Sequence, residues 1–377
     1  MTGRQAPDRQ FVNFVCAASV PDPNLELLQR LVTAQPFVLQ TVLELATAFG
    51  TLPAVTGNLL RLYDVHPLSG VSRELLVAQA DRELKNAMHI LLHWEMRVRQ
   101  AIDIMVESGL ERPLVLKGGG TKYTHYPAPY YRSSSDLDIL VEAQAGKTII
   151  AALVASGYSV ALRTPKRPYS ERHNYHIKLI KDGFAVEVHT ALENSFLPGP
   201  GPVEMASHTV PIPELHVHAI TPTPPYQLTA LLSSALREGF TLPLRDLVDL
   251  HLLVSCTPSK QLPALCEPAL RHRYSGVMNL LFAAAGNLFG TQTPAIHDHS
   301  LWGRIPDLLR PRRLHYENAG FLSTGEVLLS NREKFLNYLY LSPGPWKLGA
   351  ATAHYAMRRT LDELWPILPA TIRGEYL

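Results

Sequence analysis

The sequence predicts an α+β fold, in which a small mixed sheet is flanked by an N-terminal and a C-terminal helical region. Three observations predict it: helical apolar periodicity before residue 110, short apolar runs bounded by turn residues between 113 and 190, and renewed helical periodicity after 225. We therefore divide the chain into an N-terminal helical region (1–110), an α/β core (111–215) and a C-terminal helical domain (216–377).

Three apolar-periodic runs predict the N-terminal helices. They cover Leu25 to Val32, Phe37 to Phe49 and Ser72 to Ser108. The longest run is typical of a helix with one apolar face, and Gly109 marks its end. Its apolar stripe passes through Leu75, Leu76, Ala80, Leu84, Met88, Leu91, Leu92, Met96 and Ile102.

Short apolar runs predict the strands of the core. Leu114 to Leu116 is followed by a glycine-rich turn, and Asp136 to Val141 is a second strand. A helix is expected from Ala143 to Ser156 and a third strand from Tyr158 to Leu162. His173 to Ile180 and Phe184 to Thr190 are predicted to form a hairpin around Lys181-Asp182-Gly183. Tyr226 to Leu236 and Leu244 to Ser255 are typical of helices.

The composition is that of a globular protein, with 46% hydrophobic and 18% charged residues. A formal net charge of +2 gives no global reason to expect a nucleic-acid or membrane partner. No stretch reaches roughly 18 uninterrupted apolar residues, so no transmembrane helix is expected. The three widely spaced cysteines predict neither a disulfide framework nor a zinc site, and fit a cytoplasmic protein.

Two aspartates lie close together at the start of the second predicted strand. Asp136 and Asp138 are two residues apart, and strand side chains alternate, so both point to the same face. Two neighbouring carboxylates repel each other unless protonated, separated by water or bridged by a cation. Such oxygen ligands suit Mg²⁺ or Mn²⁺. The alternative is an exposed strand end at which Asp136 caps a turn.

A third acid, Glu187, lies in the predicted hairpin between Val186 and Val188. Glutamate is disfavoured in such a strand, and a buried carboxylate must be paired or bound to a metal. An edge strand with one wet face is the alternative. His189 shares the face of Glu187 and is either a partner of the site or a core histidine with a satisfied hydrogen bond.

The segment Lys117-Gly118-Gly119-Gly120-Thr121 follows the first predicted strand. Glycines allow a phosphate to approach the backbone, and a following helix offers free N–H groups. The segment matches neither the P-loop nor the dinucleotide fingerprint. A plain tight turn is the alternative.

Together these segments resemble the bacterial family labelled uncharacterised nucleotidyltransferase, of the DNA polymerase β-like superfamily. The similar segments are Leu116–Gly119 to the family's LKG, Tyr126–Val141 to its YP…R…SDIDLLV, Val186–His189 to its VDLH, and Leu244–Leu250 to its LRWLVDLA. The resemblance spans roughly residues 70–255. It departs at Glu187, where the family often has aspartate, and at Gly119 and Gly120, where alanine-like residues are common.

The resemblance implies a nucleotidyltransferase core that transfers a nucleoside monophosphate from a nucleoside triphosphate to an acceptor hydroxyl. It implies that Asp136, Asp138 and Glu187 are catalytic and hold Mg²⁺ or Mn²⁺. The candidates for nucleotide binding are Lys117, Gly118, Gly119, Thr121, Arg132 and Ser135, of which Arg offers a planar fork and Lys a point charge.

Several alternatives stay open at the level of sequence. The acceptor is a small molecule, a peptide, a protein or RNA. One other function is a nucleotide-binding regulator without turnover, against which the intact carboxylates argue. Another is an RNA-directed transferase similar to a tRNA-modifying toxin, for which a broad basic surface is expected. Asp246 and Asp249 share a helix face and either reach the cleft or form an ordinary inter-helix salt bridge.

Overall fold

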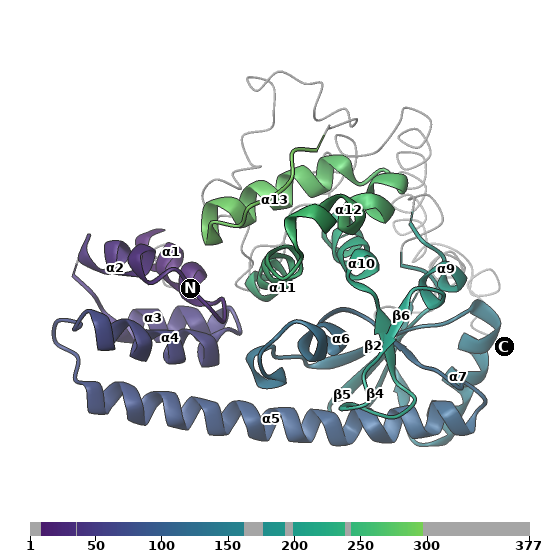
Figure 1. The fold of residues 1–377 in the computed structure, drawn as a ribbon. Helices are drawn as coiled ribbons and strands as arrows, with labels where there is room; N and C mark the ends of the chain where they lie inside the picture. Colours follow the sequence, from purple (N-terminus) through teal and green to yellow (C-terminus); the bar gives the residue numbers. More distant parts are fainter. Residues whose placement is uncertain (1–8, 35, 162–175, 193–198, 238–242, 297–377) are drawn as a thin grey trace, which may run out of the picture.

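The computed structural model describes residues 9–34, 36–161, 176–192, 199–237 and 243–296 (Figure 1). These residues form one mixed sheet with helices before and after it, which confirms the predicted α+β fold. The helical content expected for residues 297–377, and the expected strand start at His173, lie outside the described residues.

The predicted N-terminal helices are present. Asn24 and Ser72 cap α2 and α5 by accepting hydrogen bonds from the backbone N–H groups of Leu27 and Leu75. Among the described residues, no helix is long and apolar enough to span a membrane. The helices are α1 (Arg9–Ala18), α2 (Leu25–Thr33), α3 (Leu39–Ala48), α4 (Leu52–Val65) and α5 (Arg73–Glu107).

The buried face of α5 differs from the apolar stripe seen in the sequence. Leu84, Met88, Leu92 and Met96 are 36–60% exposed, and no residue between Leu76 and Trp94 is buried. The helix runs past the N-terminal helices and then along the sheet (Figure 1), so no core formed by the described residues covers its middle. Apolar periodicity shows that a face exists, and the neighbouring elements decide which face is buried. The buried residues are Leu76, Trp94, Val98, Ala101, Ile102 and Met105.

The N-terminal and C-terminal helices share one hydrophobic core. Phe14 and Leu59 from the first part of the chain belong to the same buried cluster as Leu250 and Leu281 from the last. The two helical regions, which the sequence separates, are therefore one helical body in space. The later helices are α9 (Pro202–Ala206), α10 (Pro224–Arg237), α11 (Leu244–Ser255), α12 (Leu262–Arg271) and α13 (Ser275–Phe289).

The sheet has seven strands in the order β3-β4-β5-β2-β1-β7-β6 among the described residues. The pairs β2–β5 and β1–β7 are parallel and the other pairs are antiparallel. The strands β6 and β7 lie between residues 190 and 225, where the sequence analysis predicts no strand, and β7 extends the sheet past residue 215. The strands are β1 (Leu114–Val115), β2 (Asp136–Leu140), β3 (Ser159–Val160), β4 (His176–Lys181), β5 (Phe184–His189), β6 (Thr209–Pro211) and β7 (Ile220–Pro222).

One face of the central strands is apolar. Leu137 and Ile139 of β2 and Val186 and Val188 of β5 are at most 1% exposed, and they share a core with α5 and with α7 (Ala143–Ala155). As predicted, Val115, Ile139 and Val188 lie in one sheet. Because strand side chains alternate, the intervening polar residues face the other way.

Helix α6 (Lys117–Thr124) follows β1 and packs tightly on the sheet through its glycines. A Cβ on Gly120 would lie 2.7 Å from Thr221 Cβ and 3.1 Å from the Val115 carbonyl oxygen. Gly120→Ala should therefore lower the free energy of unfolding by roughly 1–3 kcal/mol through overpacking, as measured by urea denaturation. Gly57→Ala in α4 is the control, because that Cβ would meet nothing within 4 Å. Equal effects of the two changes would contradict this packing.

Candidate active site

The pairing of β2 with β5 brings the acidic residues together. The parallel register places Asp138 opposite Glu187, Asp136 opposite Ala185 and Leu140 opposite His189. The antiparallel strand β4 adds Lys178 opposite Glu187 on the other side. All five polar side chains lie on the face of the sheet opposite the apolar core.

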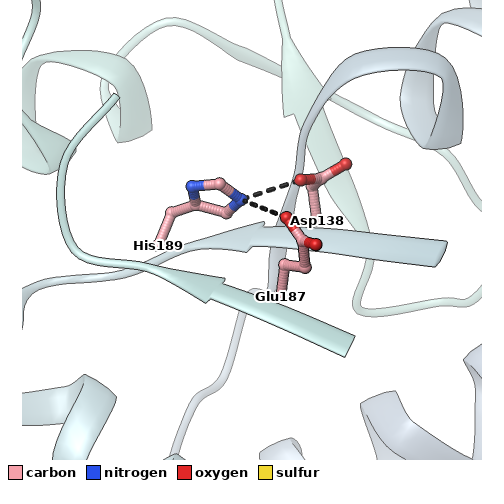
Figure 2. A group of neighbouring side chains, drawn as sticks. All are labelled: Asp138, Glu187 and His189. Carbon is pink, nitrogen blue, oxygen red and sulfur yellow. Dashed lines mark hydrogen bonds and ion pairs between the residues drawn. The ribbon is translucent and has the colours of Figure 1, made fainter. Parts of the chain in front are cut away.

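Asp138, Glu187 and His189 form a compact group (Figure 2). Each offers one ligand atom, and these atoms lie within 4.8 Å of one another. His189 Nε2 is 2.7 Å from Asp138 Oδ1 and 3.7 Å from Glu187 Oε2. Glu187 thus faces Asp138, on the side of β5 opposite the buried Val186 and Val188. The set of donors, two carboxylates and one imidazole nitrogen, suits a divalent cation.

Asp136 lies on the same face, one residue pair further along β2, and is not a member of this compact group. Burial raises its pKa, and the charges of Asp138 and Glu187 raise it further. Asp136 therefore lies close enough to the other two acids to be affected by their charges. The sequence predicts Asp136, Asp138 and Glu187 as the metal ligands. The compact group in the structure contains His189 in place of Asp136.

Two lysines neutralise the acids. Lys117 Nζ is 2.6 Å from Asp138 Oδ1, and Lys178 Nζ is 3.1 Å from Glu187 Oε1. Burial alone raises the pKa of Asp138, but Lys117 and His189 outweigh it and hold this pKa well below its usual range. Burial and Asp138 raise the pKa of Glu187, whereas Lys117 and Lys178 lower it, and the net shift is downward. Both acids are therefore ionised at neutral pH.

Helix α6 begins directly at Lys117, whose φ of 52° lies in the left-handed region that is uncommon for a residue with a side chain. The glycines after it are needed for close packing: a Cβ on Gly118 would meet Arg132, and one on Gly119 would lie 2.9 Å from Val115 Cγ1. Thr121 is buried and donates its hydroxyl to the Lys117 carbonyl oxygen at 2.8 Å. Of the predicted nucleotide-binding side chains here, only that of Lys117 is partly exposed.

The loop before β2 holds the other two predicted nucleotide-binding residues. Ser135 is exposed beside Asp136. Arg132 is buried, and its Nη2 atom lies 2.8 Å from Asp246 Oδ1 and 2.8 Å from Asp249 Oδ2. The two aspartates of α11 thus pair with Arg132 of this loop, and not with another helix as the predicted inter-helix salt bridge would require. This pairing argues against a direct contact between Arg132 and a triphosphate.

Sequence reasoning missed three basic residues near the site. Lys178 was detectable, because the predicted Asp182-Gly183 turn pairs it with Glu187. His176 stacks on His189 with ring centroids 5.1 Å apart. Lys122 is 1% exposed, and its Nζ atom lies 3.7 Å from the centroid of the Trp94 ring. Burial, followed by the charge of Arg132, lowers the pKa of Lys122 to about 7. No local pattern marks a lysine at that position as buried.

The opposite pKa shifts of the two aspartates predict opposite stability effects at neutral pH. Asp136→Asn removes a carboxylate whose charge is disfavoured, so the free energy of unfolding should stay equal or rise. Asp138→Asn removes the partner of Lys117 and His189 and should lower it by roughly 3 kcal/mol. That is the lower end for a broken buried ion pair, since Lys117 is partly exposed. Urea denaturation in EDTA measures both effects.

The pH dependence follows from the same shifts. The stabilisation by Asp138 is fully present at neutral pH and is lost progressively as the pH falls below about 5 toward its lowered pKa. The penalty from Asp136 is present above its raised pKa and vanishes below about pH 3, where this residue is protonated in both states. Equal losses of stability from both variants at pH 7 would show that the charge environments are assigned wrongly.

Comparisons with known proteins agree with the resemblance seen in the motifs. Residues 36–290 match the sequence model of a family described as uncharacterised nucleotidyltransferase. The match spans β1 to β7 and includes every residue of the site described above. Neither the curated proteins nor the solved structures contain a match to the chain.

Proposed function

Because the chain belongs to the family of uncharacterised nucleotidyltransferases, we propose that it transfers a nucleoside monophosphate from a nucleoside triphosphate to an acceptor hydroxyl. Pyrophosphate is the second product. The observation that carries this proposal is the group of Asp138, Glu187 and His189, whose ligand atoms lie within 4.8 Å of one another, with Asp136 next along the same face of β2.

The acids and His189 are the residues that would hold the divalent ions, Mg²⁺ or Mn²⁺. Carboxylate oxygens suit both ions. When bound, such an ion neutralises phosphate charge and lowers the pKa of the attacking hydroxyl. The negative charge that attracts it comes from Asp138 and Glu187, whose lowered pKa values keep them ionised at neutral pH.

The chain's own groups are assigned as follows. Lys117 contacts Asp138 and is partly exposed, and Ser135 precedes Asp136 and is exposed, so we assign both to the triphosphate oxygens. The backbone N–H groups of the first turn of α6 lie at the positive end of that helix and support an anion there. Glu187, which faces β4 and Lys178, is assigned to the acceptor hydroxyl. Catalysis then consists mainly of positioning and electrostatic stabilisation.

The test is transfer of label from each of the four α-³²P nucleoside triphosphates, ATP included, in Mg²⁺ or Mn²⁺. The acceptors are the small-molecule, protein and RNA fractions of a cell extract, and pyrophosphate release is measured in parallel. We expect label transfer that requires both the divalent ion and Asp138. If the protein binds a nucleotide but releases no pyrophosphate with any of the fractions, it is a regulator. If it releases pyrophosphate only with the RNA fraction, it is an RNA-directed transferase. A protein that neither binds nor turns over any nucleotide would refute the proposal.

A further inference from the structure

Arg132 has all three guanidinium nitrogens bound within the protein. Its side chain is 5% exposed. Nε donates to both oxygens of Asp249 at 2.9 and 3.0 Å, and Nη2 donates to Asp249 and Asp246, each at 2.8 Å. Nη1 donates to the carbonyl oxygen of Ser133 at 2.6 Å. The two aspartates lie on α11, more than one hundred residues along the chain.

Two further residues complete this network. Tyr126 donates its hydroxyl to Asp249 Oδ1 at 2.7 Å. A Cβ on Gly118 would lie 2.5 Å from Arg132 Cζ, so the guanidinium packs directly against the first turn of α6. The network therefore connects three separate segments: the first turn of α6, the loop before β2, and α11 of the helical body.

The network is adjacent to the acids on two sides. Gly118 follows Lys117, whose ammonium group contacts Asp138. Arg132 and Ser133 begin the loop that leads through Ser135 into Asp136. A shift of the guanidinium would thus be transmitted to Lys117 through one peptide bond and to Asp136 through the short serine loop.

The charges of this network do not explain it as a device for stabilising the fold. Burial alone would lower the pKa of Arg132, but Asp249 and Asp246 raise it, so the guanidinium stays charged. Burial raises the pKa of Asp246, Arg132 lowers it and the neighbouring Asp249 raises it again, and the net shift is upward. Replacing a buried ion cluster with apolar residues of similar volume is often neutral or stabilising. What such residues cannot replace is the fixed direction of the guanidinium donors.

We infer that Arg132, held by Asp246 and Asp249, is a positioning residue that fixes the start of α6 and the loop before β2 relative to each other. Through this geometry it sets where Lys117 and Asp136 lie, and it makes no contact with the nucleotide. The helical body thereby contributes to the geometry of the site from a distance. The kinetic consequences of this inference rest on the proposed function.

The test is the double variant Arg132→Met with Asp249→Leu, which removes both partners of this ion pair together. Asp246, which loses Arg132, keeps Arg245 at 3.9 Å. We expect it to fold, to exchange backbone hydrogens at least tenfold faster in residues 117–124 and 133–136, and to lower kcat/KM at least tenfold. Arg73→Met, which removes an exposed ion pair with Asp64, is the control and should change neither quantity. A folded double variant with wild-type exchange and kinetics would overturn the inference.

A second comparison separates positioning from direct binding. Asp249→Asn should raise the dissociation constant of a fluorescent nucleoside triphosphate analogue about as much as Arg132→Met does. A much larger effect of Arg132→Met would mean that Arg132 contacts the nucleotide, which would refute the positioning role.

If the double variant fails to fold, Gly118→Ala replaces it, because the added Cβ displaces the guanidinium. Unchanged hydrogen exchange in residues 117–124 and 133–136 of that variant would then overturn the inference. Absence of turnover in the wild type would refute the proposed function, whereas hydrogen exchange would still decide the positioning role.

Discussion

Replacing Asp138 with asparagine is expected to lower metal-dependent pyrophosphate release by at least about a thousandfold, equivalent to roughly 4 kcal/mol of transition-state stabilisation. Asp138 is the central acid of the site: one of its oxygens contacts both Lys117 Nζ and His189 Nε2. Asparagine keeps the shape but offers a cation one neutral oxygen in place of a charged carboxylate. The initial rate of pyrophosphate release at saturating Mg²⁺ or Mn²⁺ measures the effect.

The measurement is made at a temperature where circular dichroism shows that the variant remains folded, because the loss of the ion pairs also lowers its stability. Asp81→Asn is the matched control, since Asp81 is exposed on α5 and forms an exposed ion pair with Lys85. Asp136→Asn should also abolish turnover, as expected for a metal ligand. Near-normal turnover of the Asp138 variant would show that this acid does not hold a catalytic ion.

Much of the site follows from the sequence because strand geometry is local. The two-residue periodicity places Asp136 with Asp138, and Glu187 with His189, on one face of each strand. The Asp182-Gly183 turn fixes the register of β4 and β5, since both residues adopt positive φ as a tight hairpin turn requires. The local pattern does not determine the register between β2 and β5, because these strands are parallel and are joined by a long connection. That register brings His189 to Asp138.

The partners of Arg132 could not be predicted from the sequence either, because they also depend on contacts between distant segments. A planar guanidinium near a glycine turn fits a triphosphate or a pair of carboxylates equally well. Its choice of Asp246 and Asp249 depends on how α11 packs against the core. The shared core of the N-terminal and C-terminal helices likewise depends on tertiary packing, because apolar periodicity does not name the partner of a helical face.

Replacing Glu187 with glutamine is expected to lower turnover by roughly a hundredfold or more, while the dissociation constant of the nucleotide changes by less than about threefold. The physical reason is the position of Glu187 in the site. Its Oε1 atom contacts Lys178 of β4, whereas Lys117, which we assign to the triphosphate, contacts Asp138. Glutamine preserves the size of the side chain and an oxygen that accepts a hydrogen bond from Lys178, and it removes only the negative charge.

Two measurements separate the effects of the Glu187→Gln change: equilibrium titration with a fluorescent nucleoside triphosphate analogue in Mn²⁺, and pyrophosphate release at saturating nucleotide. Glu107→Gln, at the exposed end of α5, is the control and should leave both unchanged. A large rise in the dissociation constant at an unchanged maximal rate would place Glu187 on the nucleotide side and contradict its assignment to the acceptor. The expected pattern, tight binding with slow turnover, arises because this carboxylate acts on the oxygen that attacks, and its charge is needed most when that oxygen becomes nucleophilic.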